Sequence, residues 1–192
     1  MAKTQKKIDE IIRLVMPPRA VEKLLDNQDV LFRYIPELLA CRGFNQHNPY
    51  HVFDVLGHTL AAVDAAAEDP VVRMALLFHD VGKPISYQEG ADGIRHFHGH
   101  GKISAEIAQR VLKRLDADAA FRSEVVRLVL LHDCFISADA DSVKNLMLKV
   151  GLETFDRLLC VREADIKAQN PEFAKQRLNK LNALRAIKQQ VC

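Results

Sequence analysis

The sequence predicts an all-α protein. Ala, Leu, Lys, Arg and Glu dominate its composition, and these residues favour helices. Apolar residues recur every three or four positions through most of the chain, and no alternating segment is long enough to predict a strand. With 192 residues, the chain is long enough for one domain with a sizeable buried core.

Charge and cysteine usage exclude several classes of protein. A net charge of +2 is too small to indicate a nucleic-acid binder by itself, and no apolar run approaches the length of a membrane span. The four cysteines are scattered without a C-x-x-C pair, which argues against a zinc-thiolate site and is compatible with reduced thiols. The first seven residues lack an apolar signal core. We expect a cytoplasmic protein with no membrane partner, and the oligomeric state stays open.

Residues 1–43 are expected to form an N-terminal helical cap. A helix is predicted over residues 4–16, and Pro17-Pro18 ends it and opens the next one. A third helical segment covers residues 28–41. This region contains no histidine and no tight acidic cluster, so nothing in it indicates a catalytic site.

The histidines are distributed unevenly. All eight lie between residues 47 and 132, whereas surface histidines placed at random would rarely leave both ends of a chain empty. They are His47, His51, His58, His79, His96, His98, His100 and His132. We therefore expect some of these histidines to belong to a functional site.

The first histidine-bearing helix is predicted over residues 51–67. It would place His51, Asp54 and His58 on a single face, with His51 capping or orienting the helix. Asp69 and Pro70 then form the cap and first turn of the next helix.

That next helix ends at the adjacent residues His79 and Asp80. Neighbours on a helix point about 100° apart, so these two side chains can converge on one point between them. Imidazole and carboxylate together suit a divalent metal ion. Lys83 follows within a turn, as a mobile cation suited to phosphate oxygens.

Residues 82–101 hold five of the eight glycines and are predicted to form a long loop, which in a compact domain is often functional. His96, His98 and His100 lie at its end. Further helices are predicted over residues 102–115, 119–132, 142–150, 152–169 and from Pro171 to the end of the chain.

These motifs resemble a known family. The order of His58, His79-Asp80 and a late Asp165 is similar to that of the HD-domain metal-dependent phosphohydrolases. More narrowly, four segments resemble the HD domain attached to bacterial tRNA nucleotidyltransferases: YHVFDVLGHTL (50–60), LFHDVGKP (77–84), HFHGH (96–100) and READIKAQ (162–169). The resemblance covers residues 44–170. It implies an HD-domain helical bundle over that range, with residues 171–192 forming a C-terminal helix that packs on or extends the same domain.

The resemblance also implies a ligand set. His58, His79, Asp80 and Asp165 would hold one divalent ion from three different helices. HD proteins with two ions use further histidines; His100 and His132 occupy matching positions, and Asp80 would then bridge the ions. The sequence does not distinguish Mn, Fe, Ni, Co, Mg and Zn.

The implied activity is phosphate-ester hydrolysis by a metal-activated water. A divalent ion lowers the pKa of a coordinated water and neutralises phosphate oxygens. Lys83 and Asp80 would contact the phosphate or the ion, and one of His96, His98 or His100 could protonate the leaving group. The substrate would be a nucleotide or a related small phosphate ester, and the choice between monoester and diester stays open.

Each candidate has a structural alternative. His79-Asp80 could be a chance pair that closes a core helix, with the histidine near the negative helix end. His58 could be a core histidine, and Asp165 could pair with Arg162 or Lys167 on a solvated face. His100 and His132 could be helix-terminal histidines, His96 and His98 loop histidines, and Lys83 an exposed lysine.

A second function stays open at this point. It is a non-catalytic HD-derived helical module that binds RNA or a protein partner through its basic C-terminal helix. The tRNA nucleotidyltransferases carry a catalytic head with paired aspartates before the HD domain, and residues 1–43 cannot supply one. Asp139-Ala-Asp141 has the aspartate spacing but fits a helix cap better. We therefore expect a free-standing HD module.

Overall fold

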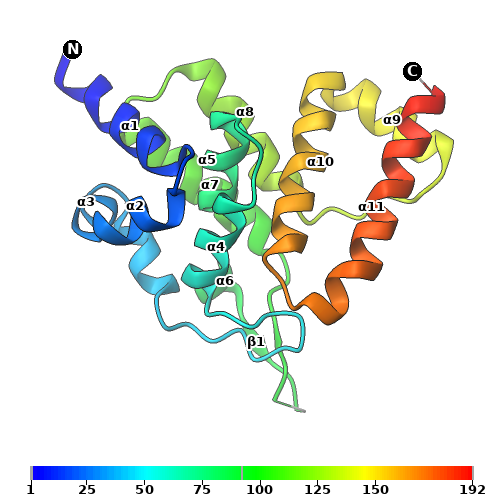
Figure 1. Ribbon diagram of the computed structural model, residues 1–192, viewed down its shortest axis with the longest axis horizontal. Helices are drawn as coiled ribbons and strands as arrows, with labels where there is room; N and C mark the ends of the chain where they lie inside the picture. Colours follow the sequence, from blue (N-terminus) through cyan, green and yellow to red (C-terminus); the bar gives the residue numbers. More distant parts are fainter. Residues whose placement is uncertain (1, 92, 192) are drawn as a thin grey trace.

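The computed structural model describes residues 2–91 and 93–191, and within them the chain is a helical bundle (Figure 1). The all-α prediction is confirmed. The first and last residues of the predicted cap and C-terminal helix, Met1 and Cys192, lie outside the described residues. The elements are α1 (Ala2–Val15), α2 (Ala20–Asp26), α3 (Gln28–Tyr34), the 3-10 helix η1 (Pro36–Cys41), α4 (Val55–Asp64), α5 (Pro70–Phe78), α6 (Lys83–Ser86), β1 (Gln88–Glu89), β2 (Arg95–His96), α7 (His100–Arg114), α8 (Ala119–Leu131), α9 (Ala140–Val150), α10 (Leu152–Lys167) and α11 (Pro171–Val191).

Helix α5 is the centre of the bundle. Every residue from Val71 to Phe78 is buried, and the helix packs against α1, α4, α7, α8 and α10. Apart from Arg73, the segment VVRMALLF of α5 is apolar on all sides. Such a helix has to be enclosed by other elements. Because α5 ends at Phe78, it places the following His79 and Asp80 in the interior, where each is 1 % exposed.

The N-terminal helices attach to this centre through α1 and α2. Ile8, Ile11 and Val15 of α1 are buried in the main core. Arg73 of α5, only 3 % exposed, donates hydrogen bonds to the carbonyl oxygens of Val15, Ala66 and Ala67 at 2.6–2.9 Å. These bonds satisfy a buried cation with backbone acceptors and tie the end of α1 to α5.

Helix α4 begins later than predicted. Asp54 accepts hydrogen bonds from the backbone N–H groups of Gly57 and Gly43, both at 2.6 Å, and so caps a helix that starts at Val55. His51 therefore lies in the preceding loop, and the predicted shared helix face of His51, Asp54 and His58 is wrong. The capping function expected of His51 belongs to Asp54.

Residues 82–101 are more ordered than a loop. They contain α6 and an antiparallel hairpin in which Gln88 pairs with His96 and Glu89 with Arg95. Strands of two residues are too short for an alternating pattern to reveal them in the sequence. The hairpin extends from the bundle at the lower edge of Figure 1.

The C-terminal helices form a second apolar cluster beside the main core. Helix α11 packs along α10 and contacts α9, as the red and orange helices of Figure 1 show. Its buried Leu181 and Leu184 join Phe155 and Leu159 of α10 and Val143 of α9. Among the described residues, no helix has both the length and the apolar character needed to cross a membrane.

Candidate metal centre

Three packed elements bring the four predicted ligand side chains together. His58 lies in α4, His79 and Asp80 directly follow α5, and Asp165 lies in the last turn of α10. Helices α4, α5 and α10 all pack on one another, so their side chains meet in the interior. Three of the four residues are 0–1 % exposed, and the side chain of Asp165 is 16 % exposed. Asp165 is therefore not on a solvated face.

The ligand atoms of these residues face one another. The Nε2 atom of His58 lies 3.0 Å from Oδ1 of Asp165, 3.2 Å from Nε2 of His79 and 3.5 Å from Oδ2 of Asp80. The Nε2 atom of His79 lies 3.3 Å from the same oxygen of Asp80 and 3.8 Å from Oδ1 of Asp165. Two imidazoles and two carboxylates thus converge on one small volume.

The other nitrogen of each imidazole faces a backbone carbonyl. The Nδ1 atom of His79 lies 2.7 Å from the oxygen of Leu76, and that of His58 lies 3.4 Å from the oxygen of Ala168. A proton on each Nδ1 leaves both Nε2 lone pairs directed at each other across 3.2 Å. Two facing lone pairs repel unless a cation or a proton lies between them, so this donor set fits a divalent ion.

A second group shares Asp80. The Oδ1 atom of this residue lies 3.3 Å from Nε2 of His100 and 3.8 Å from Nε2 of His132, and these two nitrogens are 3.1 Å apart. Their Nδ1 atoms face the carbonyl oxygens of Phe97 and Val129 at 2.8 and 2.7 Å. The two oxygens of Asp80 therefore point into two neighbouring groups of imidazole nitrogens, the arrangement that a bridging carboxylate requires.

Burial and charge set the protonation of these groups. Without a bound ion, burial works to raise the pKa of Asp80, but the positive charges of a protonated His79 and of Lys83 outweigh it and hold that pKa well below its usual value. A bound divalent ion would take the place of the proton on Nε2 of His79. Burial lowers the pKa of His132 to about 3, with the nearby His79 acting in the same direction. An ionised carboxylate and a neutral imidazole are the forms that bind a metal ion.

Lys83 differs from its prediction. It is neither mobile nor exposed: it is 5 % exposed, and its Nζ atom donates to Oδ2 of Asp80 at 2.6 Å and to Oε1 of Gln46 at 2.7 Å. The first turn of α6 places it three residues after Asp80, within reach of that carboxylate. Gln46 comes from the loop before α4, and no pattern in the sequence links it to Lys83.

A cavity of about 340 Å³ opens onto these groups. Asp80, Lys83, His100 and Asp165 are among its lining residues, together with His96 of β2 and His98 in the segment between β2 and α7. His96 and His98 are exposed, and their rings stack in parallel with centroids 5.7 Å apart. The two residues therefore face the cavity without joining either group of ligand atoms.

Three further residues adjoin the site. His51 has its ring centroid 4.9 Å from that of His58, and His51, His58 and Asp80 form another group whose ligand atoms lie within 4.8 Å. Gln169 donates to Oδ1 of Asp165 at 3.0 Å and accepts a hydrogen bond from Arg177 of α11. Sequence reasoning did not assign a site role to Gln169, because only the packing of α10 against α11 shows what it contacts.

Comparison with known proteins identifies the family. A family model described as HD domain matches residues 50–168. The chain belongs to the HD domain family. The match includes His58, His79, Asp80 and Asp165, and it agrees with the resemblance stated from the motifs.

Relatives of this HD domain protein include two tRNA nucleotidyltransferases. The chain is 32% identical over 168 residues to an A-adding tRNA nucleotidyltransferase of Deinococcus radiodurans, covering 83% of this chain and 38% of that protein. It is 32% identical over 149 residues to a CC-adding tRNA nucleotidyltransferase of Thermus thermophilus, covering 73% and 34%. A bifunctional uridylyltransferase/uridylyl-removing enzyme of Pseudomonas putida is 26% identical over 179 residues, covering 78% and 19%. The chain thus spans about a third of the length of the two tRNA enzymes.

Proposed function

We propose that this HD domain protein is a divalent-metal-dependent phosphohydrolase that acts on a nucleotide or a related small phosphate ester. The observation that carries the proposal is the pair of facing His58 and His79 Nε2 atoms, 3.2 Å apart and flanked by the carboxylates of Asp80 and Asp165. Such a donor set has open positions for water and substrate, unlike a closed four-thiolate site. Enclosure in the bundle raises the strength of every charge interaction there.

His58, His79, Asp80 and Asp165 would hold the ion, and His100 and His132 with the second oxygen of Asp80 would hold another. A bound divalent ion supplies charge neutralisation for phosphate oxygens and lowers the pKa of water. The choice among Mn, Fe, Ni, Co, Mg and Zn is a matter for metal analysis. The carbonyl oxygens of Leu76, Phe97, Val129 and Ala168 orient the imidazoles through their Nδ1 atoms.

The remaining cavity residues bind and protonate the substrate. Lys83 holds a positive charge beside Asp80, where it offsets the negative charge of a phosphoryl group. His96 and His98 are exposed residues that line the cavity, and either imidazole can give a proton to the leaving oxygen of an ester. The hairpin that carries His96 shields one side of the cavity from water.

The test combines metal analysis with a substrate panel. Purified protein is loaded with Mn²⁺, Ni²⁺, Mg²⁺ or Zn²⁺ and assayed with p-nitrophenyl phosphate, bis-p-nitrophenyl phosphate, 2′-nucleotides, 2′,3′-cyclic nucleotides and dinucleoside polyphosphates. We expect metal-stimulated turnover of at least one compound. Asp80→Ala and the isosteric Asp80→Asn should lose it, whereas Asp9→Ala on the exposed side of α1 should not.

Two results would overturn the proposal. One is a protein without bound metal, and the other is turnover that metal does not stimulate above the level of Asp80→Ala. Either result, together with RNA affinity that falls steeply with salt, would favour the non-catalytic RNA-binding module. The named tRNA enzymes among the relatives make RNA the appropriate ligand for that control.

A further inference from the structure

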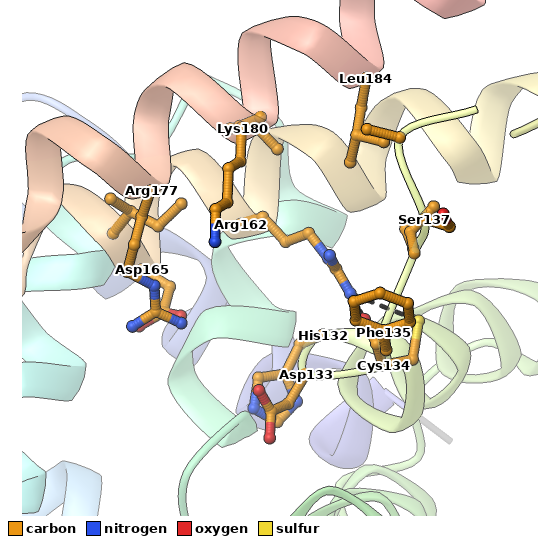
Figure 2. A pocket seen from close by; sticks show the side chains of 14 residues that line it. His132, Asp133, Cys134, Phe135, Ser137, Arg162, Asp165, Arg177, Lys180 and Leu184 are labelled. Carbon is orange, nitrogen blue, oxygen red and sulfur yellow. Dashed lines mark hydrogen bonds between the residues drawn. The ribbon is translucent and has the colours of Figure 1, made fainter. Parts of the chain in front are cut away.

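A second cavity adjoins the proposed active site. It measures about 510 Å³ and lies between α10, α11 and the segment that joins α8 to α9 (Figure 2). It shares His132, Asp133, Asp165 and Arg177 with the cavity that opens onto the metal centre. The two cavities are therefore adjacent along these four residues.

Three cationic side chains line this second cavity: Arg162 of α10 and Arg177 and Lys180 of α11. Figure 2 shows Lys180 directed from α11 into the space and Arg162 reaching across towards Phe135. Within residues 2–91 and 93–191, no carboxylate lies within 4.0 Å of any of the three cationic groups. Of the other cations on α11, Arg185 pairs with Glu163 and Lys188 with Asp156, whereas Lys175 is exposed and does not line the cavity. Arg177 and Lys180 are thus the α11 cations that face this cavity.

Arg162 is the most enclosed of these cations. Its Nη2 atom donates to the carbonyl oxygens of Leu131 and Cys134, while its Nε atom is buried without a hydrogen-bond partner among the described residues. Burial also lowers its pKa, although it is an arginine. A buried cation without a carboxylate is costly, and an anion in the cavity would compensate it.

Two carboxylates also line the cavity, so the balance of charge has to be considered. Asp133 is exposed to solvent. Asp165 directs Oδ1 to Nε2 of His58 and accepts a hydrogen bond from Gln169 on the same oxygen, so its charge is already engaged without a metal ion. Three cations therefore face one solvated carboxylate, which favours an anionic occupant.

The cavity wall also offers an aromatic surface. Phe135 is 92 % exposed, an unusual exposure for a large apolar ring, and it lies beside Arg162. Aromatic rings of this kind stack on nucleobases. The combination of cations and an open ring suits a nucleotide better than a simple alkyl phosphate.

We propose that this second cavity is a subsite for a second phosphate group, so that the preferred substrate is a nucleotide with a phosphate in addition to the one that is hydrolysed. The proposal rests on the proposed function for the identity of the first phosphate. Lys180 and Arg177 contact the second phosphate, Arg162 contributes positive charge from the wall, and Phe135 packs against the base. Gln169 positions Arg177 through its hydrogen bond and connects it to Asp165.

Calorimetry on metal-free, folded protein tests the subsite without turnover. Adenosine 3′,5′-bisphosphate is compared with adenosine 3′-monophosphate and 5′-monophosphate at about 0.1 M salt, where charge interactions remain visible. We expect the bisphosphate to bind at least tenfold more tightly than either monophosphate. Lys180→Gln should remove most of that preference and Lys180→Glu should reverse it. Lys175→Gln, an exposed lysine on the same helix, serves as the matched control and should keep it.

Turnover gives an independent readout once metal is added. The ratio of kcat/KM for the bisphosphate to kcat/KM for the monophosphates should fall about tenfold in Lys180→Gln. Equal affinities for the three nucleotides, or an unchanged preference in Lys180→Gln, would overturn the subsite even if the enzyme is active. A preference that is present in metal-free protein without any turnover would support the subsite while the hydrolase proposal fails. A ten-nucleotide RNA that binds more tightly than the bisphosphate, with a steep salt dependence, would assign these cations to nucleic acid and overturn the proposal.

Discussion

The Nζ atom of Lys83 lies 2.6 Å from Oδ2 of Asp80, the same oxygen that faces the Nε2 atoms of His58 and His79. Lys83 therefore pairs with a carboxylate that is 1 % exposed. Breaking a buried ion pair leaves an uncompensated charge in the interior. A divalent ion at the same oxygen would supply the charge that Lys83 provides in the metal-free protein.

The first prediction concerns Lys83→Met, which keeps much of the volume and removes the charge. We expect the metal-free variant to lose about 3 kcal/mol of unfolding free energy, because Asp80 remains buried without its cation. Adding Mn²⁺ should restore part of that loss. Urea unfolding with and without Mn²⁺ measures both values, and Lys102→Met on the exposed face of α7 is the control. Equal losses in the two conditions would contradict the prediction.

The second prediction concerns the number of ions bound. His58→Ala should weaken metal binding by more than the roughly 10–100-fold that loss of an outer-shell partner costs, because it removes a ligand atom. His132→Ala should leave the first ion in place and remove only the one bound through His100 and the second oxygen of Asp80. Elemental analysis after gel filtration counts the ions per chain. A wild type that binds a single ion, with no change in His132→Ala, would show that the second group holds none.

Sequence reasoning predicted the elements that depend on long periodic patterns. The helices after residue 100 start and end within about two residues of their predicted limits, since their apolar faces are regular. Asp69 and Asp139 cap the helices they were expected to cap, by accepting hydrogen bonds from Val71 and Ser142. The shared site of His58, His79-Asp80 and Asp165 was predicted from the resemblance of their motifs to those of the HD-domain family.

What the sequence did not predict depends on tertiary contacts. His51 appeared helical because its spacing to His58 fits a helix, but Asp54 caps α4, which starts at Val55, four residues later. Lys83 appeared mobile because its partners are not all local: Gln46 lies 37 residues before it. Arg177 and Gln169 come together only through the packing of α11 on α10. Patterns along a chain carry no information on such distant pairs.

The third prediction concerns Gly82, which lies between Asp80 and His100 along the chain. A Cβ atom at this position would lie 2.8 Å from the backbone oxygen of His100 and 2.8 Å from the backbone nitrogen of Ser104. Gly82→Ala would therefore push α7 away and displace His100. We expect a loss of about 1–3 kcal/mol in stability. We also expect weaker binding of the second ion, measured by elemental analysis. Gly101→Ala is the control, since a Cβ there meets its nearest neighbour at 3.5 Å; comparable effects in both variants would contradict the argument.

The fourth prediction concerns Glu163 of α10, which pairs with Arg185 of α11 and with Lys167 of its own helix. Hydrogen bonds from Lys167 and Arg185 lower the pKa of Glu163 below its usual value of 4.5. A carboxyl group with a lowered pKa stabilises the fold above pH 4.5, and this contribution is lost as the pH falls through the lowered pKa. Glu163→Gln should therefore cost about 0.5–1 kcal/mol at neutral pH. The difference from wild type should close as the pH drops below 4.5.

Urea unfolding of both proteins at a series of pH values measures this difference. Glu106→Gln, an exposed position on α7, controls for the removal of a charge without these partners. A gap between wild type and Glu163→Gln that stays constant down to about pH 3, well below the usual carboxyl pKa, would show that the pair contributes through packing and not through charge. Because Arg177 and Lys180 lie on the same helix, loosening α11 should also weaken nucleotide binding at the second cavity. Bisphosphate affinity of Glu163→Gln should then fall in parallel with its stability, and unchanged affinity would mean that the local contacts of Gln169 hold Arg177 in place by themselves.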